Sequence, residues 1–459
     1  MRPRNQAARD QLTSTLARRV AVSAGDLAEQ LGVSVPTLHR LLKEIEGSVV
    51  ATGKARRSRY ALRKPVRGEL RELPLYEIDA QGRAHRAAHL ALVHPQGACM
   101  SLQASGWPVP DESRDGWWSG LPYPLYDMRP QGYLGRQLAR AEHHRFAVAA
   151  NPDEWGDDDV VHVLSQIGSD VSGNLVLGDP AIEQWQARKL APPEPLKPRA
   201  LGRAYARLAE QAIAAGVPGS SAAGEFPKFP ALRERAGSAT PHVLVKFSGA
   251  DGSAAVRRWA DLLVCEHLAL ECAAALPGVA SARSRIVVSE GRSFLEVERF
   301  DRHGEFGRSR LACLATLDAA LVGDGSSDWT RLAARLAALG LLSADDVQRI
   351  EHLWWFGRLI ANSDMHTGNL SFRPQGTLAL APAYDMLPML YAPLPGGELP
   401  TRGFEPPPPL PAQRRVWMAA CVAAIEFWTR ASHDARVSEA FQGLCAANAL
   451  QLQRVAERV

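Results

Sequence analysis

Three side chains near the end of the chain have the types and spacing that phosphate chemistry uses. Asp364 and Asn369 lie five residues apart in LIANSDMHTGNLSF, and Asp385 follows in APAYDML. Mg²⁺ prefers oxygen ligands such as those of Asn369 and Asp385, which leaves Asp364 to accept or orient a substrate hydroxyl. Phosphoryl transfer requires such positioned groups more than covalent catalysis. The alternatives are a metal site of another kind and a polar loop without chemistry.

The same spacing occurs in protein kinases, with one difference. Kinases place a catalytic Asp, an Asn five residues later and then a second Asp, but their His stands two residues before the first Asp. Here His366 follows Asp364 by two residues. We expect His366 to pack or form a hydrogen bond within the loop, with contact to a bound nucleotide as its second candidate role.

Local patterns predict the elements that hold these residues. Ser343 and Asp346 form a pair that is typical of a helix start. The buried face of this helix recurs at helical spacing, at Ile350, Leu353, Trp354 and Leu359. The apolar stretches LSF and LALAP flank a PQGT turn, which predicts a β-hairpin. Asp364 is therefore expected at the start of a loop after the helix, and Asp385 just after the hairpin.

Two charged residues upstream could complete a phosphate site. Lys246 stands in the apolar strand pattern HVLVKF, as does the lysine by which kinases hold phosphates. Glu266 follows in the helical pattern WADLLVCEHLALECAAAL and could orient the ammonium group through an ion pair. The stretch GSSAAGEFPKF at 219–229 could bring backbone N–H groups close to phosphates, although it matches neither common phosphate-loop motif. Taken singly, each feature is more often surface charge or an ordinary loop.

The stretch FLEVERFDR, at 294–302, predicts a strand that runs into a charged loop. In a two-lobed kinase, the segment between the lobes binds adenine through backbone groups. We therefore expect backbone contacts from Glu298 and Phe300 to a nucleotide base, and a contact between Asp301 and its ribose.

Length and composition favour a soluble protein of several domains. The chain has 459 residues, which suggests about three domains. Hydrophobic residues make up 46% and charged residues 22%, as in ordinary soluble proteins. Because the chain has no apolar run of about 18 residues, no membrane span is predicted. The basic N-terminus has no apolar core after it, so no secretory signal is predicted. The cysteines show no CxxC pair, which favours reduced, mostly buried thiols and a cytoplasmic location over disulfides or zinc. They are Cys99, Cys265, Cys272, Cys313, Cys421 and Cys445.

The net charge of +4 is distributed unevenly along the chain. Residues 1–67 contain 14 Lys and Arg against 5 Asp and Glu, a net charge of +9, so the rest of the chain sums to −5. A basic segment at one end is expected where that end meets a polyanion.

The first 67 residues also show the pattern of a winged helix-turn-helix. Ser23 and Asp26 predict the start of one helix, and Ser34 with Pro36 the start of a second, after a GVS turn. An earlier helix is expected at about 6–20. Strand-like residues on both sides of a basic turn then predict a β-hairpin, which would be the wing.

Ten residues of this segment are candidates for DNA contact. Those on the second helix would face a groove, and those on the hairpin would meet phosphates or the minor groove. They are Ser34, Val35, Thr37, His39, Arg40, Lys43, Lys54, Arg56, Arg57 and Arg59. The alternative is a winged helix that binds a protein. Two-fold operator recognition would need a homodimer, on which the sequence is silent.

The region 70–190 predicts a strand-rich domain with many Pro, Gly and aromatic residues. Four aromatics could form a ligand platform, but packing in a small core is the expected role. They are Trp117, Trp118, Tyr123 and Tyr126. The Pro-rich stretch APPEPLKPRA at 191–200 predicts a semi-rigid linker.

Taken together, the motifs resemble a known family, the HipA-type serine/threonine kinases, which are toxins of bacterial toxin–antitoxin systems. The likeness is carried by D-x-H-x-x-N, by L-A-P-x-Y-D after it and by V-E-R-F-D-R before it, and it runs from about residue 70 to 450. GLPYPLYDMRPQGYLGR is similar to the family's N-terminal subdomain. The chain is more similar to the YjjJ-type members, which carry their own winged helix. In two-gene systems a separate small protein supplies DNA binding and neutralisation.

The resemblance implies an α+β fold, with a two-lobed protein-kinase-like body and an N-terminal winged helix-turn-helix. It also implies ATP and Mg²⁺ as cofactors and phosphorylation of serine or threonine. By position, Lys246 would hold the ATP phosphates and Glu266 would pair with it. Asp364 would be the catalytic carboxylate, with Asn369 and Asp385 on the metal.

Family members also phosphorylate their own Gly-rich loop, which inactivates the kinase. The expected site is a serine three residues before the loop glycine, so Ser221 before Gly224 is the first candidate and the adjacent Ser220 the second. Ser221 and Gly224 would also contact the nucleotide. The loop AAGEFPKF departs from the family's usual SGVQPK, so the resemblance specifies the nucleotide contacts of this loop less closely than those of Asp364, Asn369 and Asp385. Known family substrates are aminoacyl-tRNA synthetases, so a translation component is the expected protein substrate.

We therefore predict four parts. They are a DNA-binding winged helix (1–67), a strand-rich subdomain (68–195), a kinase N-lobe with loop, lysine strand and hinge (196–302) and a helical C-lobe with the catalytic loop (303–459). The predicted function is a protein kinase fused to its own autoregulatory DNA-binding domain. One rival is a transcriptional regulator whose kinase-like domain senses a ligand, and another is a small-molecule phosphotransferase. An antitoxin partner and a homodimer are left open, and no membrane partner is expected.

Overall fold

The computed structural model describes residues 3–54, 57–103, 105–214, 226–234 and 237–459. Their contacts form two compact units. Unit 1 comprises Met1–Asp79, Arg83–Arg129 and Glu154–Leu190, and unit 2 comprises Ala80–Gly82, Pro130–Asp153 and Ala191–Val459.

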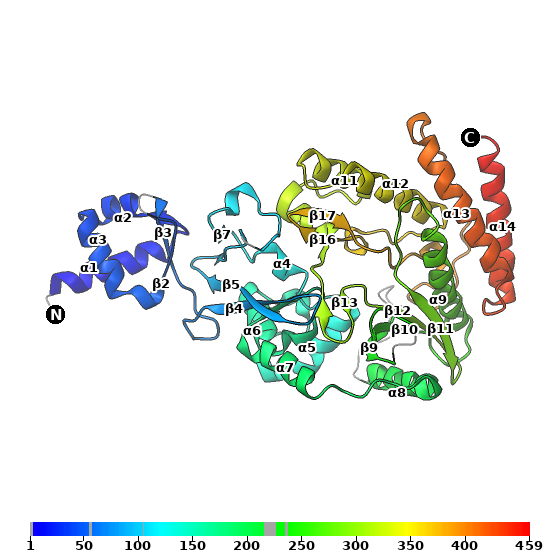
Figure 1. The fold of residues 1–459 in the computed structure, drawn as a ribbon, viewed down its shortest axis with the longest axis horizontal. Helices are drawn as coiled ribbons and strands as arrows, with labels where there is room; N and C mark the ends of the chain where they lie inside the picture. Colours follow the sequence, from blue (N-terminus) through cyan, green and yellow to red (C-terminus); the bar gives the residue numbers. More distant parts are fainter. Residues whose placement is uncertain (1–2, 55–56, 104, 215–225, 235–236) are drawn as a thin grey trace. The chain divides into compact units, whose positions relative to one another are not determined.

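Unit 1 begins with three helices and a small antiparallel sheet, which we call the head (residues 3–62; Figure 1). Its elements are α1 (Pro3–Leu16), β1 (Val22–Ser23), α2 (Ala24–Leu31), α3 (Val35–Glu44), β2 (Val49–Thr52) and β3 (Arg59–Leu62), with strand order β1-β3-β2. Both predicted caps are confirmed, because Ser23 accepts from the Asp26 N–H and Ser34 from the Thr37 N–H. Helix α1 begins and ends earlier than the predicted 6–20.

The head is packed on the rest of unit 1 rather than tethered to it. Val50 and Ala61, from strands β2 and β3, share a hydrophobic cluster with Val93, Cys99 and Trp117. Just after β3, the backbone pairs with residues 92–94 of the following sheet. The Lys64 N–H donates to Leu92 O, and the His94 N–H donates to Leu62 O. One face of the β2–β3 hairpin is therefore buried against the following domain.

The second part of unit 1 is a five-stranded sheet in the order β7-β6-β5-β4-β8. Its strands are β4 (Leu73–Ile78), β5 (Ala84–Leu92), β6 (Ala98–Cys99), β7 (Trp117–Trp118) and β8 (Leu175–Leu177), and its helices are α4 (Tyr123–Tyr126), α6 (Asp157–Ile167) and α7 (Asp179–Leu190). Trp117, Trp118 and Tyr123 are buried, and the ring of Tyr123 lies 6.2 Å from that of Trp118. Core packing is thus confirmed for these three aromatics, whereas Tyr126 is 38% exposed.

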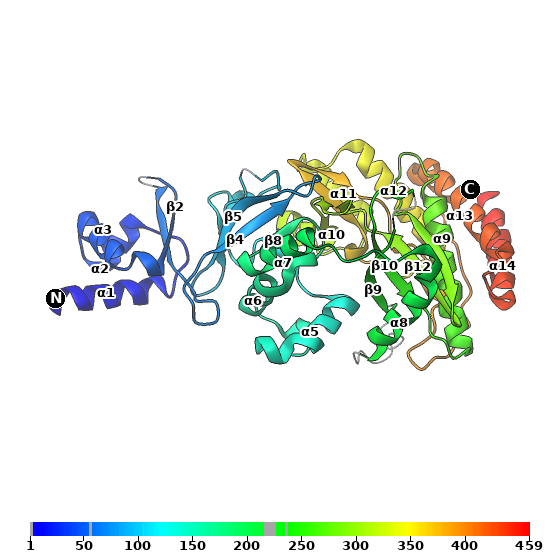
Figure 2. The ribbon, with the colours of Figure 1, turned by 60° about the horizontal axis from the view of Figure 1, so that its bottom comes forward.

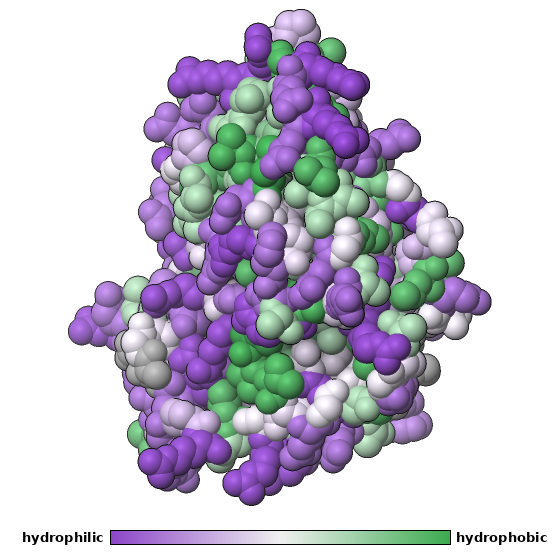
Figure 3. Space-filling model, turned by 90° about the vertical axis from the view of Figure 1, so that its right-hand side faces the viewer, coloured by the Kyte–Doolittle hydropathy of each residue, from purple (hydrophilic) through white to green (hydrophobic). Residues whose placement is uncertain are grey.

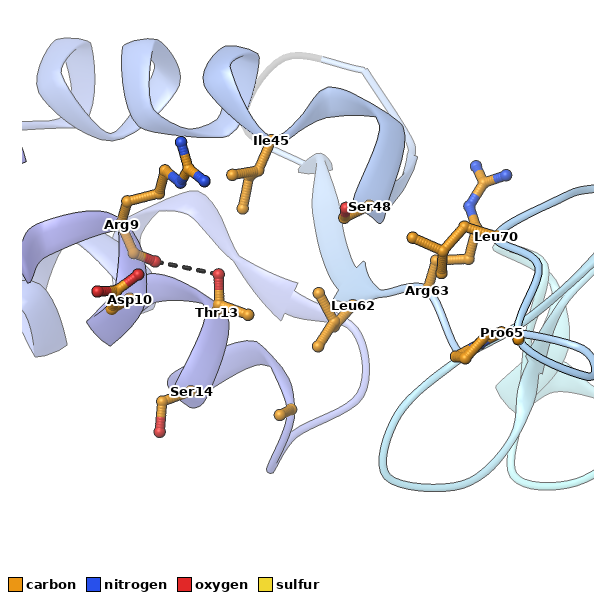
Figure 4. A pocket seen from close by; sticks show the side chains of 12 residues that line it. Arg9, Asp10, Thr13, Ser14, Ile45, Ser48, Leu62, Arg63, Pro65 and Leu70 are labelled. Atoms are coloured by element: carbon orange, nitrogen blue, oxygen red, sulfur yellow. Dashed lines mark hydrogen bonds between the residues drawn. The ribbon is translucent and has the colours of Figure 1, made fainter. Parts of the chain in front are cut away.

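A groove of about 730 Å³ opens in unit 1 where the head meets the chain that leaves it (Figure 4). Residues of α1, including Arg9 and Thr13, line one side, and Ile45, Leu62 and Leu70 line another. The lining mixes polar and apolar side chains. None of the residues predicted to contact DNA lines this groove.

The first part of unit 2 is a four-stranded antiparallel sheet in the order β11-β12-β10-β9 (Figure 2). Its strands are β9 (Lys228–Leu232), β10 (His242–Phe247), β11 (Ser284–Ser289) and β12 (Arg292–Glu298), with α8 (Leu201–Ala214) and α9 (Ala254–Ala273). Alternate residues of β10, Val243, Val245 and Phe247, pack with Tyr205 of α8. Because side chains alternate along a strand, Lys246 points to the other face. The structure also pairs part of the predicted linker with β9, since Leu196 N–H donates to Leu232 O.

The rest of unit 2 is mainly helical, with three short strands β15-β16-β17 in one sheet. The elements are α5 (Gly132–Phe146), β13 (Arg302–His303), β14 (Gly307–Arg308), β15 (Ala312–Cys313), α10 (Leu314–Leu317), α11 (Trp329–Ala338), α12 (Ala344–Leu359), β16 (Ser371–Gln375), β17 (Thr377–Leu380), α13 (Arg414–His433) and α14 (Glu439–Ala456). The predicted cap of α12 is confirmed, because Ser343 accepts from the Asp346 N–H. The predicted hairpin is confirmed as β16–β17, which turns at Gly376 with φ 84°.

The outer pair α13 and α14 leaves some apolar side chains in solvent. Val422 and Leu450 are 67% and 56% exposed. Figure 3 shows this end of unit 2, where hydrophobic groups lie between hydrophilic ones. Across the described ranges, no helix is long and apolar enough to cross a membrane. The six cysteines are free thiols, and all but Cys313 are buried.

Candidate functional site

The centre of the site is a buried ion-pair cluster in unit 2. Lys246 Nζ, on β10, donates to both carboxylate oxygens of Glu266 on α9, at 2.7 Å each, and to Asp385 Oδ1 at 2.5 Å. An ammonium group has three donors, so the whole hydrogen-bonding capacity of Lys246 is used. The side chains of Lys246 and Glu266 are 7% and 1% exposed, whereas that of Asp385 is 28% exposed. The predicted pair of Lys246 and Glu266 is therefore present, and Asp385 joins it.

Burial and charge act in opposite directions within this cluster. Burial alone would lower the pKa of Lys246, but the carboxylates of Asp385 and Glu266 outweigh it and raise that pKa above its usual value. Burial would raise the pKa of Asp385, yet the Lys246 ammonium lowers it overall. Burial does raise the pKa of Glu266, because Lys246 offsets it only in part. A charged ammonium and an ionised Asp385 thus stabilise each other.

The loop after α12 is tied together by two buried carboxamides. Asp364 N–H donates to Asn362 Oδ1 at 3.0 Å, and Asn362 Nδ2 donates to the backbone oxygen of Asp385 at 3.4 Å. Further along the loop, Asn369 Nδ2 donates to the backbone oxygen of Asp364 at 2.9 Å. These bonds hold Asp364, Asn369 and Asp385 in one constellation. The side chain of Asp364 is at the surface, where a substrate hydroxyl could reach it.

Asn369 and Asp385 have the donor atoms that Mg²⁺ needs. The amide nitrogen of Asn369 is already a donor to the protein, which leaves its amide oxygen to bind a cation. Asp385 adds a carboxylate whose lowered pKa keeps it ionised. Carboxylate and amide oxygens suit this hard cation, which retains several waters of its own. Among the described residues, no group of three or more His, Cys, Asp and Glu side chains could hold a metal ion.

His366 has a structural contact within the loop, as expected. It precedes the short 3₁₀ helix Thr367–Asn369, and its Nδ1 accepts from the Gly368 N–H at 3.1 Å. A neutral imidazole that accepts at Nδ1 carries its proton on Nε2. The ring is exposed, so the second role, contact with a nucleotide, stays a prediction.

The residues predicted to contact a nucleotide base and ribose have protein partners. Glu298 N–H donates to Arg283 O, and Phe300 O accepts from Arg373 Nη2, both at 2.8 Å. The carboxylate of Asp301 is buried and accepts from Arg302 Nη1 at 2.7 Å. A ribose would have to compete with this ion pair. These three nucleotide contacts stay predictions.

The Gly- and Ser-rich loop lies outside the described residues, and with it Ser220, Ser221 and Gly224. Phe226, the first described residue after 214, is buried. Its ring lies 5.8 Å from Lys246 Nζ and 4.7 Å from the ring of Trp259 on α9. The end of this loop is thus anchored beside the ion-pair cluster.

The DNA-binding candidates lie on the surface of the head. His39, Arg40 and Lys43 of α3 are exposed, as are Ser34 before it and Lys54, Arg57 and Arg59 on the hairpin, while Thr37 is half-buried. Arg56 lies outside the described residues. Arg59 lies 3.9 Å from Asp115 Oδ2, so a phosphate would compete with that carboxylate.

Four residues that support the site received no role in the sequence analysis. They are Asn362, Tyr384, Phe226 and Trp329. Tyr384 OH donates to Gly368 O in the loop, and Trp329 Nε1 on α11 donates to His366 O at 3.3 Å. Asn362 stands two residues before Asp364, and Tyr384 stands directly before Asp385 in the motif L-A-P-x-Y-D. The available signal for both was therefore their proximity to these aspartates. Phe226 lies within the stretch GSSAAGEFPKF but nothing distinguished it from its neighbours, and Trp329 is distant in sequence from every motif residue, so neither gave a signal.

Comparisons with known proteins match most of the chain. The family model described as "YjjJ-like toxin, middle domain" matches residues 69–186, and the one described as "HipA-like C-terminal domain" matches residues 220–437. Toxin YjjJ of Escherichia coli (strain K12) is 36% identical over 439 residues, which cover 95% of this chain and 96% of that protein.

A solved structure has a similar fold. It is a chain of the Shewanella oneidensis MR-1 toxin–antitoxin complex of HipA, HipB and operator DNA, with a TM-score of 0.51 and 16% identity. The match covers 84% of this chain and 97% of that one. At this identity the likeness shows a shared fold.

Proposed function

Because this chain belongs to the family of YjjJ-like toxins with a HipA-like C-terminal domain, we propose that it is an ATP- and Mg²⁺-dependent protein kinase that phosphorylates serine or threonine. The observation that carries this proposal is the cluster of Lys246, Glu266 and Asp385, joined through Asn362 to Asp364. The set of Lys246, Glu266, Asp364, Asn369 and Asp385 is complete, whereas a domain that only senses a ligand tends to lose one of its members.

Each residue of the site has its own proposed role in phosphoryl transfer. Lys246, held by Glu266, would bind the ATP phosphates in exchange for its hydrogen bond to Asp385, and Asp385 with Asn369 would hold the metal ion. When bound, Mg²⁺ neutralises charge that develops on the phosphate oxygens. Asp364, exposed at the start of its loop, accepts or orients the proton of the substrate hydroxyl.

Other contacts of the nucleotide follow from the family resemblance. The hinge, with Glu298, Phe300 and Asp301, receives the base and the ribose. The loop with Ser221 and Gly224 covers the phosphates and is phosphorylated at Ser221 or the adjacent Ser220. His366, whose ring is exposed in the same loop as Asp364, would contact the bound nucleotide.

The head is proposed to be a winged helix that binds DNA. Its order of three helices followed by a hairpin, its net charge of +9 over residues 1–67 and its exposed polar α3 face support this proposal. The HipA complex named above contains operator DNA and HipB, which supports autoregulation and an antitoxin-like partner. The four-part division at residues 67, 195 and 302 is part of the same proposal.

The substrate is proposed to be a protein of the translation machinery, such as an aminoacyl-tRNA synthetase. This proposal rests on the family resemblance and on the exposed position of Asp364, which a macromolecular hydroxyl can reach. It is tested by mass spectrometry of an extract incubated with the kinase.

The kinase proposal is tested with γ-labelled ATP and Mg²⁺. Wild-type protein is expected to label itself at Ser220 or Ser221, and to label a protein in cell extract. Asp364→Ala should lose the label, since it removes the group that orients the hydroxyl, while it retains ATP binding. A wild type that binds ATP and transfers no label, with or without extract, would favour the rival in which the domain is a ligand sensor.

A further inference from the structure

Tyr384 connects three segments of the proposed kinase site. Its hydroxyl donates to Gly368 O at 2.7 Å, in the loop that carries Asp364 and Asn369. Because that hydroxyl is the donor to Gly368, the 2.7 Å contact with Ser371 is a hydrogen bond in which Ser371 Oγ is the donor. The Tyr384 ring lies 5.6 Å from the ring of Phe300 in the hinge.

The backbone after Tyr384 adds a second observation. Asp385 has φ 58°, in the left-handed region that a non-glycine residue adopts only when its surroundings hold it there. Tyr384 is the residue immediately before it. A side chain anchored at both its ring and its hydroxyl therefore fixes the chain at the point where it turns Asp385 toward Lys246.

We infer that Tyr384 is a positioning residue, whose hydroxyl sets the position of the Asn369 loop relative to Asp385. This inference rests on the proposed function. Mg²⁺ demands short bonds in nearly ideal octahedral geometry, so its two protein ligands must keep a fixed separation. Asn369 follows Gly368 directly, and Asp385 follows Tyr384 directly, so the bond between Tyr384 and Gly368 joins the immediate neighbours of the two ligands.

The test is Tyr384→Phe, which keeps the ring beside Phe300 and removes only the hydroxyl. The Mg²⁺ concentration that gives half-maximal autophosphorylation is expected to rise about tenfold, as when other residues that orient metal ligands are changed, while the KM for ATP at saturating Mg²⁺ stays within about twofold of the wild type. Ser371→Ala should shift the Mg²⁺ dependence in the same direction and by less.

The matched control is Tyr391→Phe. Tyr391 is likewise hydrogen-bonded through its hydroxyl, at 3.2 Å to Asn448 Oδ1, but it is buried where Tyr384 is half-buried, and its contact lies among the C-terminal helices. Its loss should leave the Mg²⁺ dependence unchanged. If Tyr384→Phe gave the wild-type Mg²⁺ curve, or if Tyr391→Phe shifted that curve equally, the inference would be overturned.

A readout that needs no activity separates this inference from the kinase proposal. Amide hydrogen exchange in the full-length Tyr384→Phe protein should be about tenfold faster at residues 366–370 than in the wild type, and unchanged in α13 and α14. If wild-type protein transferred no phosphate but this local effect occurred, the positioning role would stand and the proposed function would fail. Unchanged exchange at residues 366–370 would overturn the positioning role, whatever the activity.

Discussion

Lys246 counteracts the effect of burial on the pKa of the two carboxylates that it contacts, Glu266 and Asp385. Glu266 and Asp385 lie on its two sides, at 2.7 and 2.5 Å from the same nitrogen. Breaking a buried pair by removing one partner leaves an uncompensated charge, which costs more than the pair itself contributes. At this site Lys246 is therefore needed for stability as well as for the proposed contact with phosphate.

Lys246→Met should lower the free energy of unfolding by about 3 kcal/mol at pH 7, measured by urea denaturation. The pH dependence should also reverse. In the wild type the pKa of Asp385 is lowered, so its stabilisation is present above the usual Asp range and is lost as the pH falls through it. In the variant, burial raises the pKa of the carboxylates, so stability should increase as the pH falls from 7 toward 5 and a proton binds.

The control for this prediction is Lys197→Met. Lys197 forms an exposed ion pair with Glu194 at 3.0 Å, and exposed pairs contribute little. A Lys246→Met protein whose stability matched this control at pH 7, or did not increase between pH 7 and 5, would contradict the charge argument.

Helix α12 supports the site through a residue without a side chain. A Cβ on Gly357 would lie 2.6 Å from Met365 Sδ and 3.2 Å from Met386 Cε. Met365 follows Asp364 and Met386 follows Asp385, so both functional loops lie against this helix at the same point. The glycine is therefore a packing requirement of the site, because the helix itself would be more stable with alanine.

Gly357→Ala should leave the free energy of unfolding within about 1 kcal/mol of the wild type, since the gain in helix propensity offsets the crowding of two flexible side chains. Phosphotransfer should fall about tenfold, because small displacements of reacting groups are costly. Gly443→Ala in α14 is the matched control, since no atom lies within 4 Å of a Cβ there. It should stabilise the protein without affecting the rate. Equal rates in the two variants would show that α12 does not constrain the loops.

Local patterns predicted the elements of this site well, and contacts between distant segments less well. Ser343 and its helix, the hairpin after the loop and the strand with Lys246 depend on neighbours a few residues away, which a sequence displays. The spacing of Asp364, Asn369 and Asp385 predicted a candidate site, and the structure links these residues through hydrogen bonds of Asn362 and Asn369. The hydrogen bond from the Trp329 indole N–H to His366 O depends on how α11 packs, and no rule of residue spacing predicts that packing.

At the scale of the whole chain, positive charge is concentrated in residues 1–67, with the remainder slightly negative. Within unit 1 the β2–β3 hairpin buries one face on the following sheet, whereas Lys54 and Arg57 near its turn and most polar residues of α3 are exposed. The sequence predicted the hairpin but not this packing, because Val50 and Ala61 match an ordinary strand equally well.

Lys54→Ala/Arg57→Ala should weaken binding to the DNA upstream of the gene and reduce its salt dependence. Each phosphate contact contributes a slope of about 0.9 in the logarithm of affinity against that of salt concentration, because it releases counterions. The slope should therefore fall by about 1.8, measured by fluorescence anisotropy between low and physiological salt.

The control, Arg188→Ala/Lys189→Ala, removes the same charge from α7 in the same unit, and it should leave the slope unchanged. An equal loss in both variants would indicate an effect of net charge alone, and salt-independent binding would exclude phosphate contacts by the head.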